Sequence, residues 1–336
     1  MSEQIKIGTR ESQLAVWQAT HVQNLLKETG VDSELIFIKS EGDTNTITPL
    51  YELGIQGIFT KTLDAALLNK QIDIAVHSMK DVPTLPAKGI RQAAVLKRAS
   101  YKDILVYKGE WAMVKNELAI THDSPLTPPV AVRAGIHHSP RPLPFGQAFT
   151  IATSSIRRKA QWLHRYPNHK IENLRGNVNT RLRKLEDNDW NGVIFAAAGL
   201  ERIHLRPENS IDLDWMLPAP SQGAITISCR DDDDAAFNVC KPFNDKSTFT
   251  CTKIERDFLR ALLGGCSTPI SALAIIENDF IIFKGNICSV DGKKIFDIEK
   301  KIAVNNGNNL GIDAANELLE NEEVRQILYE IRNEKK

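Results

Sequence analysis

The sequence predicts an α/β protein with two larger units and a small α+β domain at its C-terminal end. Helix and strand patterns alternate through the first two thirds of the chain, which is typical of layers with much parallel strand pairing. The C-terminal part instead places Asp291-Gly292 between two apolar runs, a strong signal for a β-hairpin, and continues with two helical patterns. We therefore expect an antiparallel sheet there.

The elements are expected in the following order. Strand patterns lie at 5–7, 35–38, 72–76, 104–107, 149–152, 192–196, 224–228, 280–283 and 294–296. The first helix pattern follows Thr9 or Ser12, either of which can cap it. Further helices are expected at 61–68, 312–319 and 324–331. One more helix begins near residue 155, and a separate one ends at residue 185. Because the strand at 224–228 follows the crossover-like linker 217–221, we expect it to return to the first sheet. We place the domains at 1–99 plus 218–232, at 100–217 and at 233–336.

The composition argues against several functional classes. Lys and Arg number 42 and Asp and Glu number 42, so a general affinity for nucleic acid is not expected. No apolar run is long enough to span a membrane, and no apolar stretch of signal-peptide length opens the chain. The five cysteines are widely spaced and include no CxxC pair. We expect reduced thiols in a cytoplasmic protein, with neither a disulfide framework nor a metal site.

The first candidate site is the segment from His77 to Pro83, directly after the apolar strand at 72–76. Ligands of open α/β sheets bind outside the carboxyl ends of the strands. Lys80 and Asp81 at that position suit anion binding and proton transfer. The alternative is a polar strand exit that Pro83 terminates.

The second candidate is the segment from Thr153 to Arg158, where hydroxyl residues precede a helix that begins with two arginines. The positive end of a helix dipole disfavours arginine unless an anion is close. Free N–H groups, hydroxyls and guanidinium groups together form a carboxylate or phosphate receptor. The alternative is that Arg157 and Arg158 face solvent or pair with acidic residues elsewhere.

The third candidate repeats this pattern, because Arg175 and Arg181 flank the turn Gly176-Asn177 at the start of a helix. With Arg10 at the start of the first helix, the pattern predicts a ligand that carries several negative groups. The chain contains no GxxxxGK[ST] motif, which argues against a phosphate-loop enzyme.

The fourth candidate is Cys266, which follows Gly264 and Gly265 and precedes Pro269 by three residues. Paired glycines leave the backbone free and clear space around the sulfur. The residues alone leave two alternatives open, a reactive thiol or a small buried thiol in a turn.

Taken together, these segments resemble the porphobilinogen deaminase family. The matching segments occur in the family's order at Thr9–Ser12, Trp17-Gln18, Gly57–Lys61, His77–Pro83, Thr153–Arg158, Leu174–Arg181, Ala198–Arg202, Ser221–Ala224 and Gly264–Pro269. The match is specific because it is joint, since no single segment identifies the family.

The resemblance implies two lobes like those of type II periplasmic binding proteins and a third domain that carries the cysteine. It implies a transferase of tetrapyrrole (haem) biosynthesis that condenses four porphobilinogen molecules, with loss of ammonia, into hydroxymethylbilane. It also implies a dipyrromethane cofactor joined to Cys266 by a thioether, and a monomer. Carried onto this chain, the catalytic carboxylate that stabilises the electron-poor intermediate is that of Asp81.

Every porphobilinogen brings an acetate and a propionate, so the growing chain needs many cations and N–H donors, and arginine suits bidentate carboxylate binding. We assign cofactor and substrate carboxylate binding to Arg10, Ser12, Ser78, Lys80, Thr153, Ser154, Ser155, Arg157, Arg158, Arg175, Gly176, Arg181, Arg202 and Gln222.

The chain departs from the family pattern in three places. Gln56 stands where Lys is common, and Glu41 stands where Arg is common. The proline-rich segment 108–148 is longer than the usual connection, and we assign it neither an ordered element nor a function.

Two other functional classes suit parts of the pattern. A non-catalytic binding protein for a polycarboxylate would also use two such lobes, but has no use for Gly-Gly-Cys or a third domain and normally carries an export signal. A ligand-sensing regulator would need a DNA-binding helix pair, for which the pattern leaves no place before the first lobe.

Overall fold

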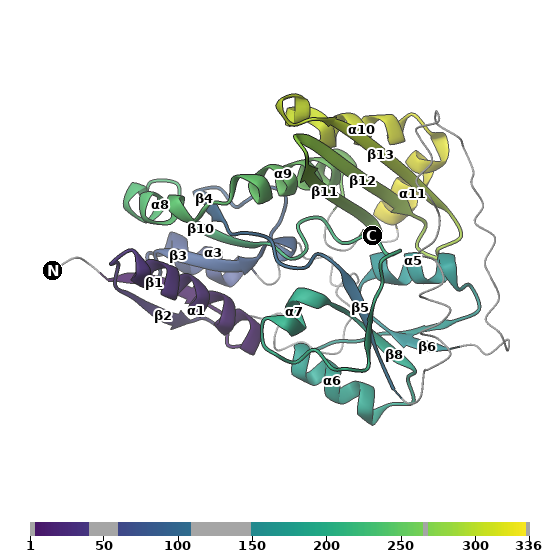
Figure 1. Ribbon diagram of the computed structural model, residues 1–336, viewed down its shortest axis with the longest axis horizontal. Coiled ribbons are helices and arrows are strands. Elements are labelled where there is room, and N and C mark those ends of the chain that lie inside the picture. The colour runs from purple at the N-terminus through teal and green to yellow at the C-terminus, as the bar shows by residue number, and fades with distance from the viewer. Residues whose placement is uncertain (1–3, 40–59, 109–148, 265–267, 334–336) are drawn as a thin grey trace.

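The computed structural model describes residues 4–39, 60–108, 149–264 and 268–333. Their strands form three sheets, two with five strands and one with three (Figure 1). The predicted fold class is confirmed: two α/β lobes are followed by a small α+β domain. Glu41, Gln56, Cys266 and residues 109–148 lie outside the described residues.

The first sheet has the strand order β2-β1-β3-β10-β4. Its strands are β1 (Ile5–Thr9), β2 (Ser33–Phe37), β3 (Ile74–Ser78), β4 (Ile90–Val95) and β10 (Ile225–Arg230). The first three pair in parallel, whereas β10 runs antiparallel to both of its neighbours. The strand expected to return from the second lobe is therefore the one inserted between β3 and β4.

Three helices and a short 3-10 turn belong to this sheet, namely α1 (Gln13–Glu28), α3 (Lys61–Leu68), α8 (Asp234–Cys240) and η3 (Lys241–Phe243). Ser12 caps α1 by accepting a hydrogen bond from the backbone N–H of Ala15. Ala236 and Cys240 of α8 pack in the same core as β10. The first core thus continues beyond residue 232, where we placed its boundary from the sequence.

The second sheet has the order β7-β6-β8-β5-β9. Its strands are β5 (Asp103–Tyr107), β6 (Thr150–Ala152), β7 (Lys170–Glu172), β8 (Gly192–Ala196) and β9 (Ser210–Asp212). Its helices are α5 (Ile156–Arg165), α6 (Val178–Asp187) and α7 (Ala197–Glu201). β6, β7 and β8 pair in parallel, and β5 is antiparallel to β8.

The two five-stranded sheets share one arrangement. In each, the fourth strand in the order runs antiparallel to the third. That strand is β10 in the first sheet and β5 in the second, and each begins where the chain has just crossed from the other lobe. The segments 96–102 and 213–224 are therefore the two crossovers, and both lie where the lobes meet (Figure 1).

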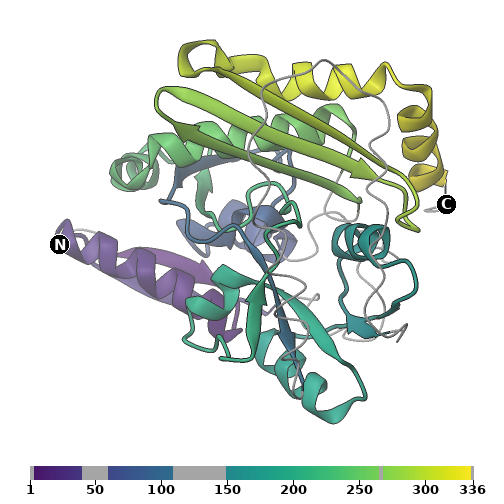
Figure 2. The same cartoon turned by 45° about the vertical axis from the view of Figure 1, so that its right-hand side comes forward.

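The third domain contains the expected hairpin. Its antiparallel sheet β11 (Ile270–Glu277), β12 (Phe280–Cys288) and β13 (Ile295–Ala303) lies beside α9 (Lys246–Ala261), η4 (Val304–Asn309), α10 (Leu310–Leu319) and α11 (Glu322–Asn333) (Figure 2). Phe258 of α9 packs edge-to-face on Phe283 of β12, with ring centroids 5.2 Å apart. Helix α10 crosses α9 closely at Gly311, where a Cβ atom would lie 2.1 Å from the carbonyl oxygen of Ile254.

A buried carboxylate on α9 joins this domain to both crossovers. Glu255 is fully buried and pairs with Arg98 of the first crossover, at 2.6 Å between Oε1 and Nη1. It also accepts hydrogen bonds from the backbone N–H of Ser221 in the second crossover, at 2.6 Å, and of Ala274 in β11, at 2.8 Å. Because an unpaired carboxylate is costly in such a place, these contacts hold α9 firmly against the junction of the lobes.

Candidate functional site

The Asp81 turn, defined as Met79–Pro83, leaves the carboxyl end of β3. Residues Met79–Asp81 form a single 3-10 turn, and the N–H of Met79 donates to the carbonyl of Ala224 at 3.0 Å. The hydroxyl of Ser78 just before it accepts a hydrogen bond from the side-chain amide of Gln18 on α1, at 2.8 Å. The turn is thus placed at the sheet edge where α/β proteins bind their ligands, as the sequence predicts.

Lys80 points from this turn toward the second crossover. Its Nζ lies 3.3 Å from Oε1 of Gln222. Burial and the nearby charge of Arg158 lower the pKa of Lys80 to about 8. An ammonium group in such a place favours an anionic partner, because each negative charge brought close offsets part of its desolvation.

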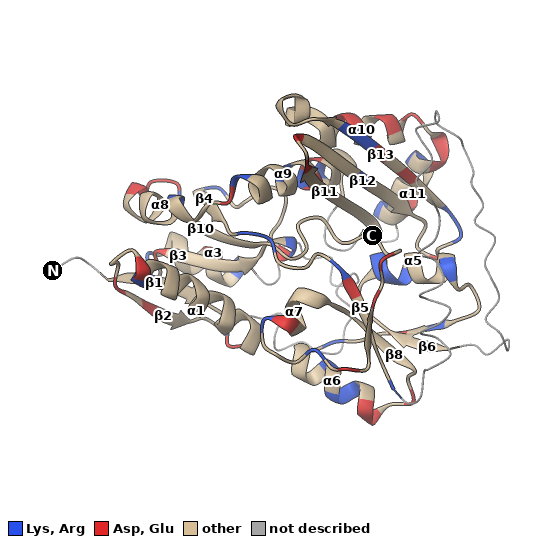
Figure 3. Ribbon diagram, viewed as in Figure 1, with Lys and Arg blue, Asp and Glu red and all other residues tan. Residues whose placement is uncertain are grey.

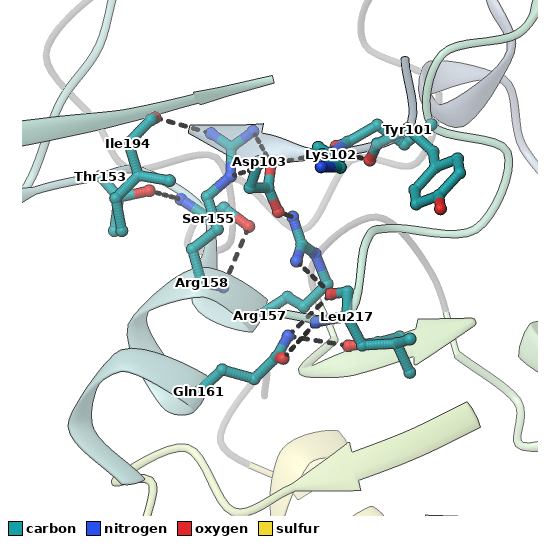
Figure 4. Close-up of polar contacts among 12 residues, drawn as sticks. Tyr101, Lys102, Asp103, Thr153, Ser155, Arg157, Arg158, Gln161, Ile194 and Leu217 are labelled. Atoms are coloured by element: carbon teal, nitrogen blue, oxygen red, sulfur yellow. Dashed lines mark hydrogen bonds and ion pairs between the residues drawn. The ribbon is translucent and has the colours of Figure 1, made fainter. Parts of the chain in front are cut away.

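The two arginines at the start of α5 face a buried carboxylate. Asp103, the first residue of β5, is fully buried and accepts from Nη2 of Arg157 at 2.7 Å and from Nη2 and Nε of Arg158 at 2.7 and 3.1 Å (Figure 4). Each arginine also donates to a carbonyl, Arg157 to Leu217 and Arg158 to Ile194. The arginines thus pair with an acidic residue elsewhere in the chain, which the sequence analysis considered as an alternative to a receptor for a ligand anion.

This pairing resolves the unfavourable charge at the helix start. Burial alone raises the pKa of Asp103, but the charges of Arg157 and Arg158 outweigh it and lower the pKa to about 2. Ser155 caps α5 through the N–H of Arg158, and the hydroxyl of Thr153 accepts from the N–H of Ser155. One carboxylate thus faces two guanidinium groups, and the network keeps a positive excess.

Gln222 connects the two lobes at this point. Its amide nitrogen donates to Oδ1 of Asp103 at 2.9 Å and to the carbonyl of Tyr101 at 2.8 Å, while its amide oxygen faces Lys80. The donors and acceptors around Gln222 are satisfied only in this orientation of the amide. A continuous polar chain therefore runs from the Asp81 turn to the arginines of α5.

The third sequence candidate forms a second cationic helix start. Gly176 has φ +113°, a conformation that favours glycine, and Asn177 caps α6 by accepting from the N–H of Thr180. Arg181 folds back over this turn, donating to the carbonyl of Gly176 at 2.7 Å and to the hydroxyl of Ser154 at 3.5 Å. Both α5 and α6 carry several Lys and Arg residues (Figure 3).

Arg181 shows which side chains the fold brings together. Burial and the charge of Arg158 lower its pKa to about 10, the charge of Asp81 raises it, and that of Arg175 lowers it. Arg175 is itself only 4% exposed, and burial lowers its pKa. Side chains from both lobes thus act on one another around Asp81.

Other members of the predicted set lie near α1 and the second crossover, or stabilise the fold. Arg202 lies over the ring of Trp17, with its guanidinium carbon 5.7 Å from the ring centroid, and donates to the carbonyl of Gly223. Ser12 is engaged as the cap of α1. Arg10 lies near His77, whose pKa falls to about 4 through burial and that charge.

The sequence reasoning missed Asp103 and Arg256. Asp103 directly precedes the strand predicted at 104–107 and was given no role there, although two arginines at a helix start are stable only with an anion close by. Arg256 on α9 reaches the backbone of the Asp81 turn. The sequence around Arg256 carries no local signal, because its partners are carbonyl oxygens far away in the chain.

Cys266 lies outside the described residues, but the other four cysteines show which thiols are unsuited to covalent chemistry. Cys229, Cys240, Cys251 and Cys288 are all buried. Burial raises the pKa of each of them, to about 12 for Cys240 and Cys251. Because the thiolate is the reactive form, none of these four thiols suits a covalent attachment at neutral pH.

Across the residues described here, no helix is both long and apolar enough to cross a membrane.

A two-lobed α/β protein with buried cations around one carboxylate turn is suited to hold a ligand with several negative charges. The family model for the porphobilinogen deaminase dipyromethane cofactor binding domain matches residues 5–238, and that for the porphobilinogen deaminase C-terminal domain matches residues 249–320. The chain therefore belongs to the porphobilinogen deaminase family of transferases, and both the resemblance and the expected cofactor class are confirmed.

The sequence is similar to those of curated relatives over nearly the whole chain. Porphobilinogen deaminase from Acidithiobacillus ferrooxidans is 37% identical over 305 residues, which are 90% of each chain. The proteins of the same name from Campylobacter hominis and Chloroherpeton thalassium are 35% and 34% identical over 94% and 99% of each chain. Among solved structures, the methionine binding protein MetQ is 13% identical, with a TM-score of 0.41 over 73% of this chain and 92% of its own.

Proposed function

We propose that the chain condenses four porphobilinogen molecules, releasing ammonia each time, into the linear tetrapyrrole hydroxymethylbilane. The family assignment supports the substrate and the pathway. The observation that carries the proposal is the gathering of buried cations from both lobes around the Asp81 turn, namely Lys80, Arg157, Arg158, Arg175 and Arg181.

These residues suit a dipyrromethane that carries acetate and propionate groups. The charges of Asp81 and Asp103 act on Lys80, and that of Asp81 also acts on Arg181. Arg157 and Arg158 share the single carboxylate of Asp103. Dipyrromethane, when bound, supplies the pyrrole to which the first substrate is joined. We propose that its thioether forms with Cys266, since the other four cysteines are buried with raised pKa.

The chain's own residues have distinct roles in this proposal. In each addition a carbon–nitrogen bond of porphobilinogen breaks, ammonia leaves with the electron pair, and the freed carbon bonds to the terminal pyrrole, which loses a proton. We assign to the Asp81 carboxylate the stabilisation of the developing positive charge and the acceptance of that proton. The arginines and Lys80 orient the carboxylates of the reactants.

We further propose that the predicted carboxylate-binding set acts through three groups. The first surrounds the Asp81 turn and the α6 start and comprises Ser78, Lys80, Ser154, Arg175, Gly176 and Arg181. The second is the α5 network of Thr153, Ser155, Arg157, Arg158 and Gln222, and the third, toward α1, comprises Arg10, Ser12 and Arg202. The three sheets support the three proposed domains, with the first extending to Phe243. We also propose a monomer that acts in the cytoplasm.

Intact-protein mass spectrometry tests the proposal. The purified chain should carry an adduct of two linked pyrrole units on the peptide that contains Cys266. Cys266→Ala should lack both the adduct and the activity, whereas the matched control Cys251→Ala should keep both, because the thiol of Cys251 is buried. An active chain without an adduct, or an adduct on another cysteine, contradicts the proposed attachment.

A further inference from the structure

A side chain from the third domain holds the backbone of the Asp81 turn. Arg256 lies on α9, and its Nη1 donates to the carbonyl oxygens of Val82 at 3.0 Å and Met79 at 3.4 Å. Its Nη2 donates to the carbonyl oxygen of Pro83. One planar guanidinium group thus contacts carbonyls on both sides of Asp81 in the chain.

Two other backbone hydrogen bonds to described residues fix the start and the end of the turn. Strand pairing between β3 and β10 ends at Ser78, opposite Ile225. Beyond it, the N–H of Met79 reaches Ala224, and the N–H of Val82 closes the turn onto Met79 at 3.1 Å. Carbonyl groups that leave a sheet edge need other donors, and Arg256 supplies them for three residues of the turn.

The position of the Asp81 carboxylate depends on this backbone. Among the residues that the structure describes, the side chain of Asp81 makes no hydrogen bond or ion pair, although its charge acts on Lys80 and Arg181. A carboxylate that no described side chain holds takes its position from its own main chain. Whatever holds Met79, Val82 and Pro83 therefore also places Asp81.

Helix α9 is itself held in place and leads to the cofactor segment. Glu255, the residue before Arg256, joins α9 to both crossovers through Arg98 and Ser221. The helix ends at Ala261, and Cys266 follows five residues later in the sequence. Arg256 thus links the carboxylate turn of the first lobe to the helix that precedes the attachment residue.

We propose that Arg256 is a positioning residue that sets the place of the Asp81 carboxylate relative to the bound pyrrole chain. This inference rests on the proposed function, in which Asp81 acts on a chain attached at Cys266. A carboxylate that moves by about 1 Å loses the geometry of proton transfer and can lower the rate about 10²-fold. The three contacts that Arg256 makes with this turn are to backbone carbonyls, so their loss should alter turnover more than substrate binding.

The test compares Arg256→Ala and Arg256→Lys with Arg260→Ala. Arg260 lies one turn further along α9, is 45% exposed and pairs with Asp257, so it is a matched control for loss of a guanidinium from the same helix. For each protein, the adduct on Cys266 is quantified by intact mass, and kcat and KM for porphobilinogen are measured per adduct-bearing molecule. Asp81→Asn serves as the reference for loss of the carboxylate.

We expect Arg256→Ala to carry the adduct and to lower kcat about 10- to 100-fold, with KM within about threefold. Arg256→Lys keeps a cation but not the planar guanidinium group, so its kcat should lie between those of the wild type and Arg256→Ala. Millimolar guanidinium should partly restore kcat of Arg256→Ala. Arg260→Ala should keep kcat within about twofold, as expected for an exposed pair.

Other outcomes separate this inference from the function on which it rests. If Arg256→Ala matches Arg260→Ala in kcat and differs only in thermal stability, Arg256 is structural and the inference is wrong. If Arg256→Ala does not fold, kcat of Arg256→Lys is compared with that of Arg260→Ala, and equal values show that the inference is wrong. A wild-type chain that lacks the adduct or makes no tetrapyrrole contradicts the proposed function instead.

Discussion

Replacing Asp103 by asparagine removes the carboxylate that faces both arginines of α5 while keeping its size. Four donors converge on its two oxygens, three from Arg157 and Arg158 and one from Gln222. The asparagine side chain retains one acceptor oxygen, but its NH₂ group must face a guanidinium N–H. The variant therefore leaves two buried cations with unmatched donors.

The expected loss of stability follows from these contacts. Removing one partner of a buried ion pair costs about 3–5 kcal/mol, because the remaining charge stays buried. The pKa of Asp103 gives a smaller value for the stabilisation by its charge. The difference between a pKa of 3.8 for an ordinary aspartate and about 2 here corresponds to about 2 kcal/mol. We expect Asp103→Asn to lower the free energy of unfolding of the second lobe by about 3–5 kcal/mol at pH 7.

Urea unfolding followed by tryptophan fluorescence is a suitable assay. Trp162, Trp190 and Trp215 pack in the cores of the second lobe, so their emission reports on the lobe that contains Asp103. The control is Asp212→Asn, which breaks partly exposed pairs with Lys102 and Arg206 and should cost less than about 1 kcal/mol.

The pH dependence gives an independent check with a defined sign. The pKa of Asp103 is lower in the folded chain, so the stabilisation by its charge is complete above about pH 4 and is lost as the pH falls toward about 2. The difference in the free energy of unfolding between wild type and Asp103→Asn should stay constant from pH 7 to 5 and become smaller below pH 4. A loss below about 1 kcal/mol at pH 7, equal to that of the control, would refute the reasoning.

Two further predictions concern the site and the third domain. The pKa of Lys80 is about 8, so its ammonium group is charged below that pH and neutral above it; KM for porphobilinogen should rise several-fold from pH 7.5 to 9.5, and Lys80→Arg should remove the rise. An unchanged pH profile in that variant excludes Lys80 as its source. Gly311→Ala should lower stability in urea by about 1–3 kcal/mol, since its Cβ would lie 2.1 Å from the carbonyl oxygen of Ile254. Gly199→Ala, whose Cβ would meet only Leu14 at 3.7 Å, should be neutral, and equal losses would contradict the close-packing argument.

Local patterns predicted the elements well where a segment carries its own signals. The helix at 61–68 and the strand at 192–196 have the predicted bounds, and the Asp291-Gly292 hairpin joins β12 to β13. Helix α1 was also predicted from its cap at Ser12, and its buried face includes Ala15, Ala19, Val22 and Leu26. The alanines allow the helix to pack closely on the sheet.

The candidate site was predicted in parts. Each cationic helix start was recognisable because caps and arginines are adjacent in the sequence, and Ser155 and Asn177 do cap α5 and α6. The partner of Arg157 and Arg158 was not identifiable, since Asp103 lies 54 and 55 residues away in the chain. The attachment at Cys266 stays a prediction.

The sequence by itself determined the fold class, the family, and the segments that carry the chemistry, because periodicity, caps and motif order are properties of neighbouring residues. Only the tertiary structure decided which charges meet. It inserted β10 between β3 and β4, which brings Gln222 between Lys80 and Asp103, and it placed Arg256 of α9 against the Asp81 turn. Such contacts depend on how distant segments pack, and the energy of a buried charge depends on the partner that packing supplies.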